Sequence, residues 1–253
     1  TGEDIGKGTR FDTASVTINV FDTNDNPPVF EHAPYNIRLL ESNGMIDNQE
    51  PKITADSDPI FIAFATDADD PPFNTIEYNL RDGGRYNDHF RINGTTGHIF
   101  LAKSLDRERE PFMTLEILAM DSGSPRLTST GTLNVIVEDV NDHTPTFESN
   151  EYVLSVEENV DIGFSVASIL AEDEDDSLNS DVSYSIEGTE YFTIDRKNGT
   201  IMTVLDLDRE DIESHSFTVV AIDSSEFYPL TGSASILINI MDKNDNTPLI
   251  INN

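Results

Sequence analysis

The sequence predicts an all-β protein built from tandem β-sandwich repeats, and two features carry this prediction. Short runs of apolar residues alternate with polar residues at period two, as in residues 115–119, 133–137 and 217–221, which is typical of strands with one buried face. Turn signals such as Asp82–Gly84 and Asn198–Gly199 separate the runs, and no capped helical pattern competes. Acidic motifs also recur about once per hundred residues. Units of this length with about seven strands fit a β-sandwich.

The repeated motifs set the order of the units along the chain. An Asx-rich segment occurs three times, at Asp22–Phe30, Asp139–Phe147 and Asp242–Ile250, with spacings of 117 and 103 residues. Four shorter motifs recur in the same order between these copies. They are Tyr35 to Glu41 with Tyr152 to Glu158, Asp67–Asp69 with Asp173–Asp175, Leu105–Glu108 with Leu207–Glu210, and Ala119–Asp121 with Ala221–Asp223. Random acidic sequence would not hold this register, so the two units are homologous.

This register predicts three segments. Residues 1–26 are expected to be the C-terminal strand and linker of a preceding unit, with the strand marked by the alternation at residues 16–20. Residues 27–143 form a complete repeat, and residues 144–253 form a second complete repeat plus the start of the next linker. The first repeat carries 11 extra residues near 44–59, a stretch rich in Pro, Asp and Asn that predicts an inserted surface loop.

The charge balance limits the possible partners. The 253 residues include 15 Lys plus Arg against 48 Asp plus Glu, a formal net charge of −33. This excess of acid excludes nucleic acid and an anionic membrane surface as partners, because both require a basic footprint. Cysteine is absent, so disulfides and thiolate metal sites are excluded. The sequence shows neither a long apolar span nor a signal peptide, and we expect any membrane anchor to lie in parts of a longer chain.

Acids held at the ends of strands in each unit point to a bound cation. Two carboxylates about 4 Å apart repel by roughly 4 kcal/mol at an effective dielectric constant near 20. Calcium relieves such repulsion well because it takes about 6–8 oxygen ligands from carboxylates, amides and backbone carbonyls. The strict octahedral geometry of magnesium suits a crowded cluster less well. The repeated linkers supply Asn and Asp oxygens, and their prolines remove competing hydrogen-bond donors.

These motifs resemble those of cadherin ectodomains over nearly the whole chain. The family's linker pattern D-x-N-D-N-x-P-x-F is met fully at Asp22–Phe30. His143 replaces the last Asn of the second copy, and Ile250 replaces the final Phe of the third. The resemblance implies seven-stranded Greek-key sandwiches, joined end to end by linkers that hold three calcium ions at each junction.

Carried over residue by residue, the resemblance implies one complete junction between the two full repeats. Its ligands come from the first repeat, the linker and the second repeat. They are Glu41, Asp106 and Glu108; Asp139, Asn141 and Asp142 with the carbonyls of Val140 and His143; and Asp173, Asp175 and Asp223 with a loop carbonyl near Asn179. Eight of these side chains are carboxylates, so three calcium ions would leave two net negative charges. If His143 acts only through its carbonyl, its replacement of Asn has little effect.

The two outer junctions are expected to be less complete. At the first, about one ion is expected, because the acids of a preceding repeat are missing; its ligands are Asp22, Asn24, Asp25, Asn26, Asp67, Asp69 and Asp121. At the last, partial occupancy is expected; its ligands are Glu158, Asp208, Glu210, Asp242, Asn244 and Asp245.

Other interpretations of the acids explain less of the sequence. An EF-hand would need Gly at its sixth position and Glu at its twelfth, but Pro27 and Ala33 stand there. A β-sandwich glycosidase would need one unique pair of carboxylates, whereas these acids recur in each unit. An acidic surface repeat of a bacterial adhesin or a halophile protein would spread its acids over exposed faces. Either D-R-E motif alone would be an ordinary ion pair at a turn.

The resemblance therefore implies a binding and mechanical role with no enzymatic activity. The chain would be an extracellular, calcium-stiffened segment of a single-pass plasma-membrane adhesion receptor, and its partners would be other cadherin-type ectodomains, homophilic or heterophilic. Asn93 and Asn198 begin N-x-T patterns for N-linked glycans, but Asn-Gly is equally favoured there by turn geometry. The 5 histidines share no metal-binding spacing, which favours surface or structural roles.

Overall fold

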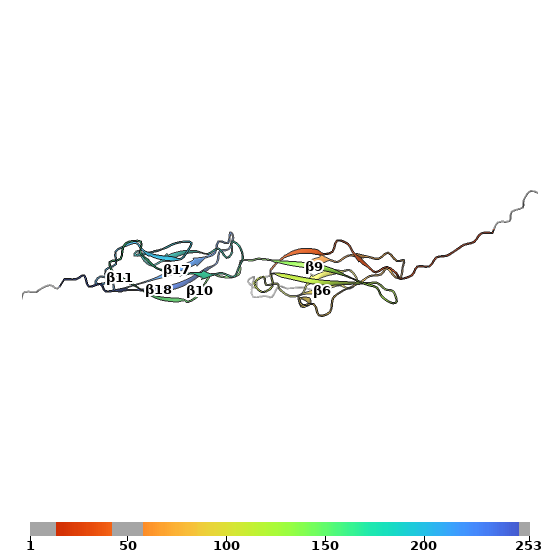
Figure 1. Cartoon of the computed structure of the whole chain (residues 1–253), viewed down its shortest axis with the longest axis horizontal. Coiled ribbons are helices and arrows are strands. Elements are labelled where there is room, and N and C mark those ends of the chain that lie inside the picture. Colours follow the sequence, from red (N-terminus) through yellow and green to blue (C-terminus); the bar gives the residue numbers. More distant parts are fainter. Residues whose placement is uncertain (1–13, 42–57, 248–253) are drawn as a thin grey trace, which may run out of the picture.

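The computed structural model describes residues 14–41 and 58–247 and contains two β-sandwiches placed end to end (Figure 1). The first sandwich contains nine strand segments and one short 3-10 helix: β1 (Val29–Phe30), β2 (Tyr35–Leu40), β3 (Phe61–Ile62), β4 (Ala65–Thr66), β5 (Glu77–Leu80), η1 (Asn87–His89), β6 (Phe90–Ile92), β7 (His98–Leu101), β8 (Phe112–Met120) and β9 (Thr128–Glu138). The second contains β10 (Thr146–Phe147), β11 (Glu151–Glu157), β12 (Ser165–Ser168), β13 (Ala171–Glu172), β14 (Ser183–Glu187), β15 (Phe192–Ile194), β16 (Thr200–Thr203), β17 (Ser214–Ile222) and β18 (Thr231–Met241). No helix in the described residues is long and apolar enough to cross a bilayer.

Both sandwiches have the same topology, which confirms the predicted fold class. One sheet of the first sandwich has the order β2-β9-β8-β5, and the other has β3-β7-β6. The second sandwich repeats these orders as β11-β18-β17-β14 and β12-β16-β15. The short pairs β1-β4 and β10-β13 form separate two-stranded sheets. Counting β1 with β2 and β3 with β4 as interrupted strands gives the seven strands of the prediction.

One strand pair in each sandwich is parallel, although all the other pairs are antiparallel. β2 runs parallel to β9, and β11 runs parallel to β18. These pairs join the beginning and end of each unit, so the rest of the sandwich serves as the long connection that parallel pairing needs. As a result, the chain enters each unit at one end of the sheet and leaves it at the opposite end.

Period-two alternation produces the core, as predicted. Leu115, Ile117 and Ala119 of β8 are buried, as are Leu133 and Val135 of β9. The corresponding alternation on β17 and β18 builds a second, separate core. Each sandwich therefore has its own hydrophobic core, and the segment between them is mostly polar.

The strand predicted over residues 16–20 does not form. Val16, Ile18 and Val20 are 80–91% exposed, and residues 14–28 contain no strand. A strand needs a neighbour for its ladder hydrogen bonds, and the described residues provide none for this segment. The insertion predicted near 44–59 lies almost wholly outside the described residues, as do residues 1–13 and 248–253.

Candidate metal centres at the sandwich junctions

Parallel pairing of β2 with β9 places Glu41 beside the linker. Glu41 directly follows β2, and its backbone N–H donates to the Glu138 carbonyl (2.9 Å), which extends the ladder by one residue. Its buried carboxylate accepts the N–H of Val140 on Oε1 (2.8 Å) and the N–H of Arg107 on Oε2 (2.7 Å). Glu41 therefore ties the linker to the turn that contains the D-R-E motif.

This D-R-E turn places further carboxylates beneath the linker. Asp106 organises the turn by accepting the Arg109 N–H on Oδ1 (2.9 Å). Glu41, Glu108 and Asp139 each have an oxygen within 4.8 Å of the other two. The ligand atoms of Glu108, Asp142 and His143 meet within the same limit.

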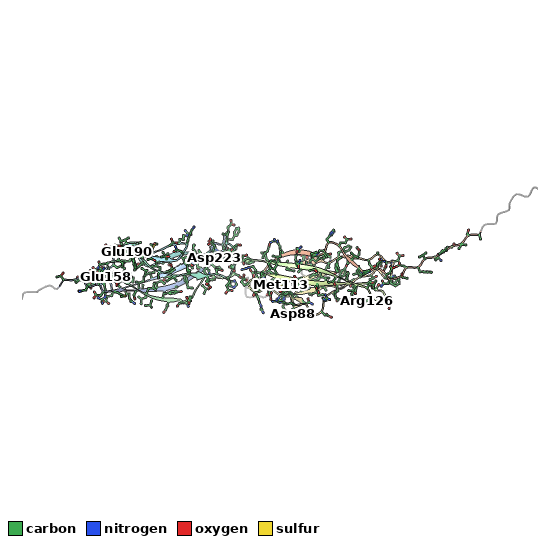
Figure 2. All side chains as sticks on the ribbon, viewed as in Figure 1. Asp88, Met113, Arg126, Glu158, Glu190 and Asp223 are labelled. Carbon is green, nitrogen blue, oxygen red and sulfur yellow. The ribbon has the colours of Figure 1, made fainter. Side chains whose placement is uncertain are left out.

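Two loops of the second sandwich hold the other side of the linker. Asp175 follows β13 and accepts the His143 N–H on both carboxylate oxygens (3.3 Å each). Asp223 follows β17, is buried, and accepts the Asn141 Nδ2 hydrogen on Oδ2 (3.1 Å). Figure 2 shows Asp223 at the end of the second sandwich that faces the first. Linker and loops thus converge at one junction.

The remaining predicted ligands of this junction also lie within it, with one difference. Asp173 Oδ1 accepts the Asp175 N–H (3.0 Å), as expected for a D-x-D turn. Asn179, expected to act through a carbonyl, instead donates its Nδ2 hydrogen to Asp139 Oδ2 (2.8 Å). Asp139 also accepts the Asp176 N–H (3.1 Å). Asp139 is therefore held by the second sandwich through two bonds.

The sequence did not predict the side-chain contacts of two basic residues at the central junction. Arg107 Nε donates to Asp139 Oδ1 (2.5 Å), and Nη2 contacts Glu108 and donates to the Glu174 carbonyl (2.9 Å). His143 Nδ1 lies 2.9 Å from Asp142 Oδ1 and 3.2 Å from Asp175 Oδ1. His143 thus contributes its ring as well as its backbone. The only signal in the sequence was that each residue lies within a repeated motif.

Crowding of acids raises several pKa values at the central junction. Burial is the largest cause for Asp175 and raises its pKa to about 6, with repulsion from Asp173 and Asp139 acting in the same direction. Burial likewise raises the pKa of Glu41, against the two N–H donors that lower it. Burial alone would lower the pKa of His143, but Asp175, Asp142 and Glu108 outweigh it and raise that pKa. The cluster therefore holds more negative charge than its own donors neutralise.

The N-terminal junction repeats the part of the central junction that is formed by the linker and the second sandwich. Asp22 Oδ2 accepts the Asp70 N–H (2.7 Å), and Asn26 donates its N–H to Asp69 Oδ2 (3.3 Å). Asp121 is buried and accepts the Gly123 and Leu127 N–H groups. The other predicted ligands are bound nearby: Asn24 Nδ2 donates to the Pro125 carbonyl, Asp25 accepts from Asn26 Nδ2, and Asp67 accepts the Asp69 N–H. The linker and loops of this junction therefore match those on the second-sandwich side of the central junction.

The C-terminal junction repeats the part of the central junction that is formed by the first sandwich and the linker. Glu158 accepts the N–H groups of Lys243 and Arg209 (2.7 Å each), as Glu41 does from its equivalents. Glu158, Asp208 and Glu210 have oxygens within 4.8 Å of one another. Asp242 and Asn244 are exposed, and Asp245 accepts the Asn159 Nδ2 hydrogen (2.6 Å). Figure 2 shows Glu158 at the end of the second sandwich opposite Asp223.

Buried oxygens without hydrogen-bond partners gather at the junctions. Among the described residues, seven buried side-chain polar atoms have no partner. Five of these are oxygens of predicted ligands: Asn24 Oδ1, Asp67 Oδ2, Asp121 Oδ2, Asn141 Oδ1 and Asp173 Oδ2. Leaving a buried acceptor unpaired costs about 1–3 kcal/mol. This donor set is all oxygen and mostly anionic, which fits a hard divalent cation.

Sandwiches joined end to end by acidic linkers define a class of modular rod proteins, and comparisons with known proteins identify the family. The sequence model of the Cadherin domain matches residues 54–138 and 152–241. Over 97% of its own length, the chain is 37% identical to mouse Protocadherin Fat 4. Over 94% of its own length, it is 33% identical to mouse Cadherin-23. The crystal structure of mouse Cadherin-23 EC22-24 covers 88% of this chain with a TM-score of 0.77 and 35% identity, and the chain covers 67% of that structure. The chain belongs to the cadherin family.

The chain spans only a small part of these relatives. It covers 5% of mouse Protocadherin Fat 4 and 7% of mouse Cadherin-23. Cadherin repeats in general bind calcium, and the acidic clusters described above lie where each repeat meets the next linker.

Proposed function

We propose that the junctions bind calcium and that the ions stiffen the chain into a rod. The five unpartnered buried oxygens carry this proposal, because a cation is the partner that they lack. At the central junction, acids from two sandwiches and the linker lie close together without enough donors to satisfy them. A bound cation would satisfy oxygens of both sandwiches at once.

Three calcium ions at the central junction fit its charge. The carboxylates proposed as ligands are Glu41, Asp106, Glu108, Asp139, Asp142, Asp173, Asp175 and Asp223. Asn141 would add an amide oxygen, and Val140, His143 and the loop at Asn179 would add carbonyls. Arg107 and His143 share these acids, and we propose that calcium displaces their side chains from the carboxylates.

The outer junctions would hold fewer ions. Asp67, Asp69 and Asp121 with the 22–26 linker offer about one site at the N-terminal junction, supported by three unpartnered oxygens there. Glu158, Asp208 and Glu210 offer a partial site at the C-terminal junction, where the described residues bring no acid from another sandwich.

The role that follows is binding and mechanical, not catalytic. We propose that residues 1–26, 27–143 and 144–253 are a linker segment and two repeats in the extracellular part of a single-pass adhesion receptor. The membrane anchor would lie elsewhere in a longer chain, and the partners would be other cadherin-type ectodomains. Membership of the cadherin family and the end-to-end arrangement of the sandwiches support this role (Figure 1).

Small-angle X-ray scattering with thermal unfolding tests this function. The whole chain would be titrated with calcium after treatment with a chelator, with equal magnesium and equal ionic strength as controls. We expect calcium to increase the maximum dimension of the chain and to raise its melting temperature. Extracellular modules bind calcium with Kd of about 10⁻⁴–10⁻³ M, so the change should fall in that range. Identical scattering and melting with and without calcium would contradict the proposal. An equal response to sodium chloride would favour the alternative of an acidic surface repeat whose acids respond to salt in general.

A further inference from the structure

The outer face of the smaller sheet in the first sandwich is apolar and aromatic. Ile62 of β3 is 51% exposed, and Phe64, two residues further along, is 56% exposed. Phe100 of β7 lies on the same face, with the Arg91 guanidinium 4.7 Å from its ring centroid. His98 packs edge-on against Phe100 with 6.2 Å between centroids. Exposed apolar side chains that are contiguous mark sites where a partner or ligand packs.

The equivalent face of the second sandwich is more polar. Ile62 pairs with His98 in the first sandwich, and Ser168 pairs with Thr200 at the same place in the second. The two hydroxyls of that second pair lie 2.7 Å apart. Arg91 and Phe100 correspond to Thr193 and Met202. Leu170, the counterpart of Phe64, is also exposed (58%), so the two faces differ in Ile62 and in the aromatic side chains of Phe64 and Phe100.

A glycan acceptor pattern lies in the same row of this sheet. The Asn93 N–H donates to the His98 carbonyl (2.8 Å), which aligns Asn93, His98 and Ile62 across the three strands. Asn93 is exposed, and its Oδ1 accepts the N–H groups of Thr95 and Thr96 (3.0 and 3.1 Å). The amide oxygen of Asn93 is thus occupied within the turn. The exposed Asn93 side chain lies in the same row as His98 and Ile62, on the outer face of the sheet.

The second acceptor pattern is not equivalent to the first. Asp195 makes the backbone bonds in the second sandwich that Asn93 makes in the first. Asn198 lies three residues later, next to Gly199, whose φ of +63° explains the Asn-Gly pair by turn geometry. In the first sandwich the left-handed residue is Gly97 (φ +69°), so no such backbone requirement falls on Gly94. Turn geometry therefore accounts for the Asn-Gly pair of the second pattern, whereas in the first it accounts for Asn93 as a turn cap but not for Gly94 or Thr95.

We propose that Asn93 carries an N-linked glycan whose first sugars pack on the apolar face formed by Ile62, Phe64 and Phe100. The acceptor pattern is Asn93-Gly94-Thr95. In the modification, Nδ2 of Asn93 loses a proton and forms a bond to C1 of the sugar, while the C1–O bond to a lipid diphosphate donor breaks and the diphosphate leaves. The apolar C–H face of a pyranose suits an aromatic surface, and its covering would remove apolar area from water. This proposal rests on the proposed extracellular location, since the donor acts in the secretory pathway.

Enzymatic removal of the glycan provides a sharp test because it converts Asn93 to Asp. The whole chain would be secreted from eukaryotic cells and compared with the N93D variant, which has the same polypeptide as the deglycosylated protein. Asp195 at the equivalent position shows that the turn accepts an Asp. The matched control is N198D, which keeps the oxygen that accepts the Thr200 N–H.

We expect peptide mass spectrometry to find a glycan at Asn93. N93D should melt a few degrees lower than the glycosylated chain and should bind a hydrophobic dye about twofold more strongly, whereas N198D should change neither property. In an Ile62→Ser, Phe100→Met background, which copies the second sandwich, N93D should no longer lower the melting temperature. An unmodified Asn93, or a glycan whose removal changes neither melting nor dye binding, would overturn the proposal. The calcium response, measured on the same samples, reports separately on the proposed function.

Discussion

The central and C-terminal junctions begin from the same local structure and differ in what faces it. Glu41 and Glu158 each accept two backbone N–H groups from equivalent residues at 2.7–2.8 Å. Both glutamates are shielded from solvent, yet desolvation by the surrounding protein raises the pKa of Glu41, whereas the Arg209 and Lys243 N–H groups lower the pKa of Glu158. The repeated motif therefore supplies the ligands, and the neighbouring sandwich decides their electrostatics.

The residues around these glutamates show the same contrast. The side chain of Glu108 is 12% exposed, and that of its equivalent Glu210 is 45% exposed. Arg107 reaches across to the second sandwich, while Arg209 lies 4.0 Å from Glu210 and is 39% exposed. A junction thus becomes a closed, highly charged site only when a second sandwich covers it.

Replacement of the two glutamates should give the largest contrast. Calcium at ten times its Kd stabilises by about 1.4 kcal/mol for each independent site. Because Glu41 contacts both the linker and the D-R-E turn, E41Q should abolish most of a calcium-dependent stabilisation of about 4 kcal/mol at three sites. E158Q should reduce the calcium response much less. Thermal unfolding with and without calcium measures both variants, and an equal loss in the two would show that the second sandwich is irrelevant to binding.

Replacement of the arginines should show the reverse dependence on calcium. Arg107 neutralises part of the central cluster through Asp139 and Glu108, so R107Q should destabilise the chelated protein by about 2 kcal/mol. With calcium bound, the effect should be smaller, because the ions replace its charge. R209Q is the matched control and should have little effect in either condition, since exposed pairs contribute little. A larger loss for R107Q in calcium than in chelator would contradict this role.

Acidity should stabilise the central junction in the absence of calcium. The pKa of Asp175 is about 6 in the folded chain and 3.8 is its ordinary value, so the folded state binds the proton more tightly. Stability from this group is therefore gained as pH falls through 6 toward 3.8, and lost as pH rises through that window. We expect about 1–2 kcal/mol, less than the full shift would give because solvent screens the junction.

The D175N variant isolates this effect. In chelator, the melting temperature of the native chain should fall between pH 5 and pH 7, and D175N should flatten that part of the profile. Calcium affinity of the native chain should also weaken below pH 6, because protons compete with the ion. An unchanged slope in D175N would assign the pH dependence to other carboxyl groups.

The sequence predicted the fold and the position of the acids because both follow from repetition. Period-two patterns placed Leu115 and Val135 in the core, and the register of four motifs brought Glu41, Asp139 and Asp223 to one junction. Both features belong to a local structure that occurs more than once in the chain, so comparing its copies was enough to predict them.

Features that depend on a single copy could not be predicted. The alternation at residues 16–20 looks like that of any strand, but only a neighbouring strand could make it one. The hydrogen bond from Arg107 to the Glu174 carbonyl depends on how the two sandwiches are placed. The repeated motif contains no information about that placement. The apolar face around Phe100 likewise follows from residues in which the two repeats differ.

His143 offers the smallest and most selective test of the central junction. Both other linkers have Asn at this position, Asn26 and Asn246. The acids around it raise the pKa of His143, so its stabilising effect is fully present below about pH 6.5 and is lost as pH rises through the raised value. Because the ring is partly exposed, H143N should cost about 0.5 kcal/mol or less in chelator at pH 6, and this cost should be smaller at pH 8.

In calcium, H143N should bind the ions as the native chain does, because Asn keeps the backbone carbonyl proposed as the ligand. Thermal unfolding at the two pH values measures the first effect, and calorimetric titration measures the second. If H143N bound calcium more tightly, the imidazole would be a competitor for the carboxylates of Asp142 and Asp175 even at neutral pH. The central junction would then differ from the other two by its linker sequence as well as by its covering sandwich.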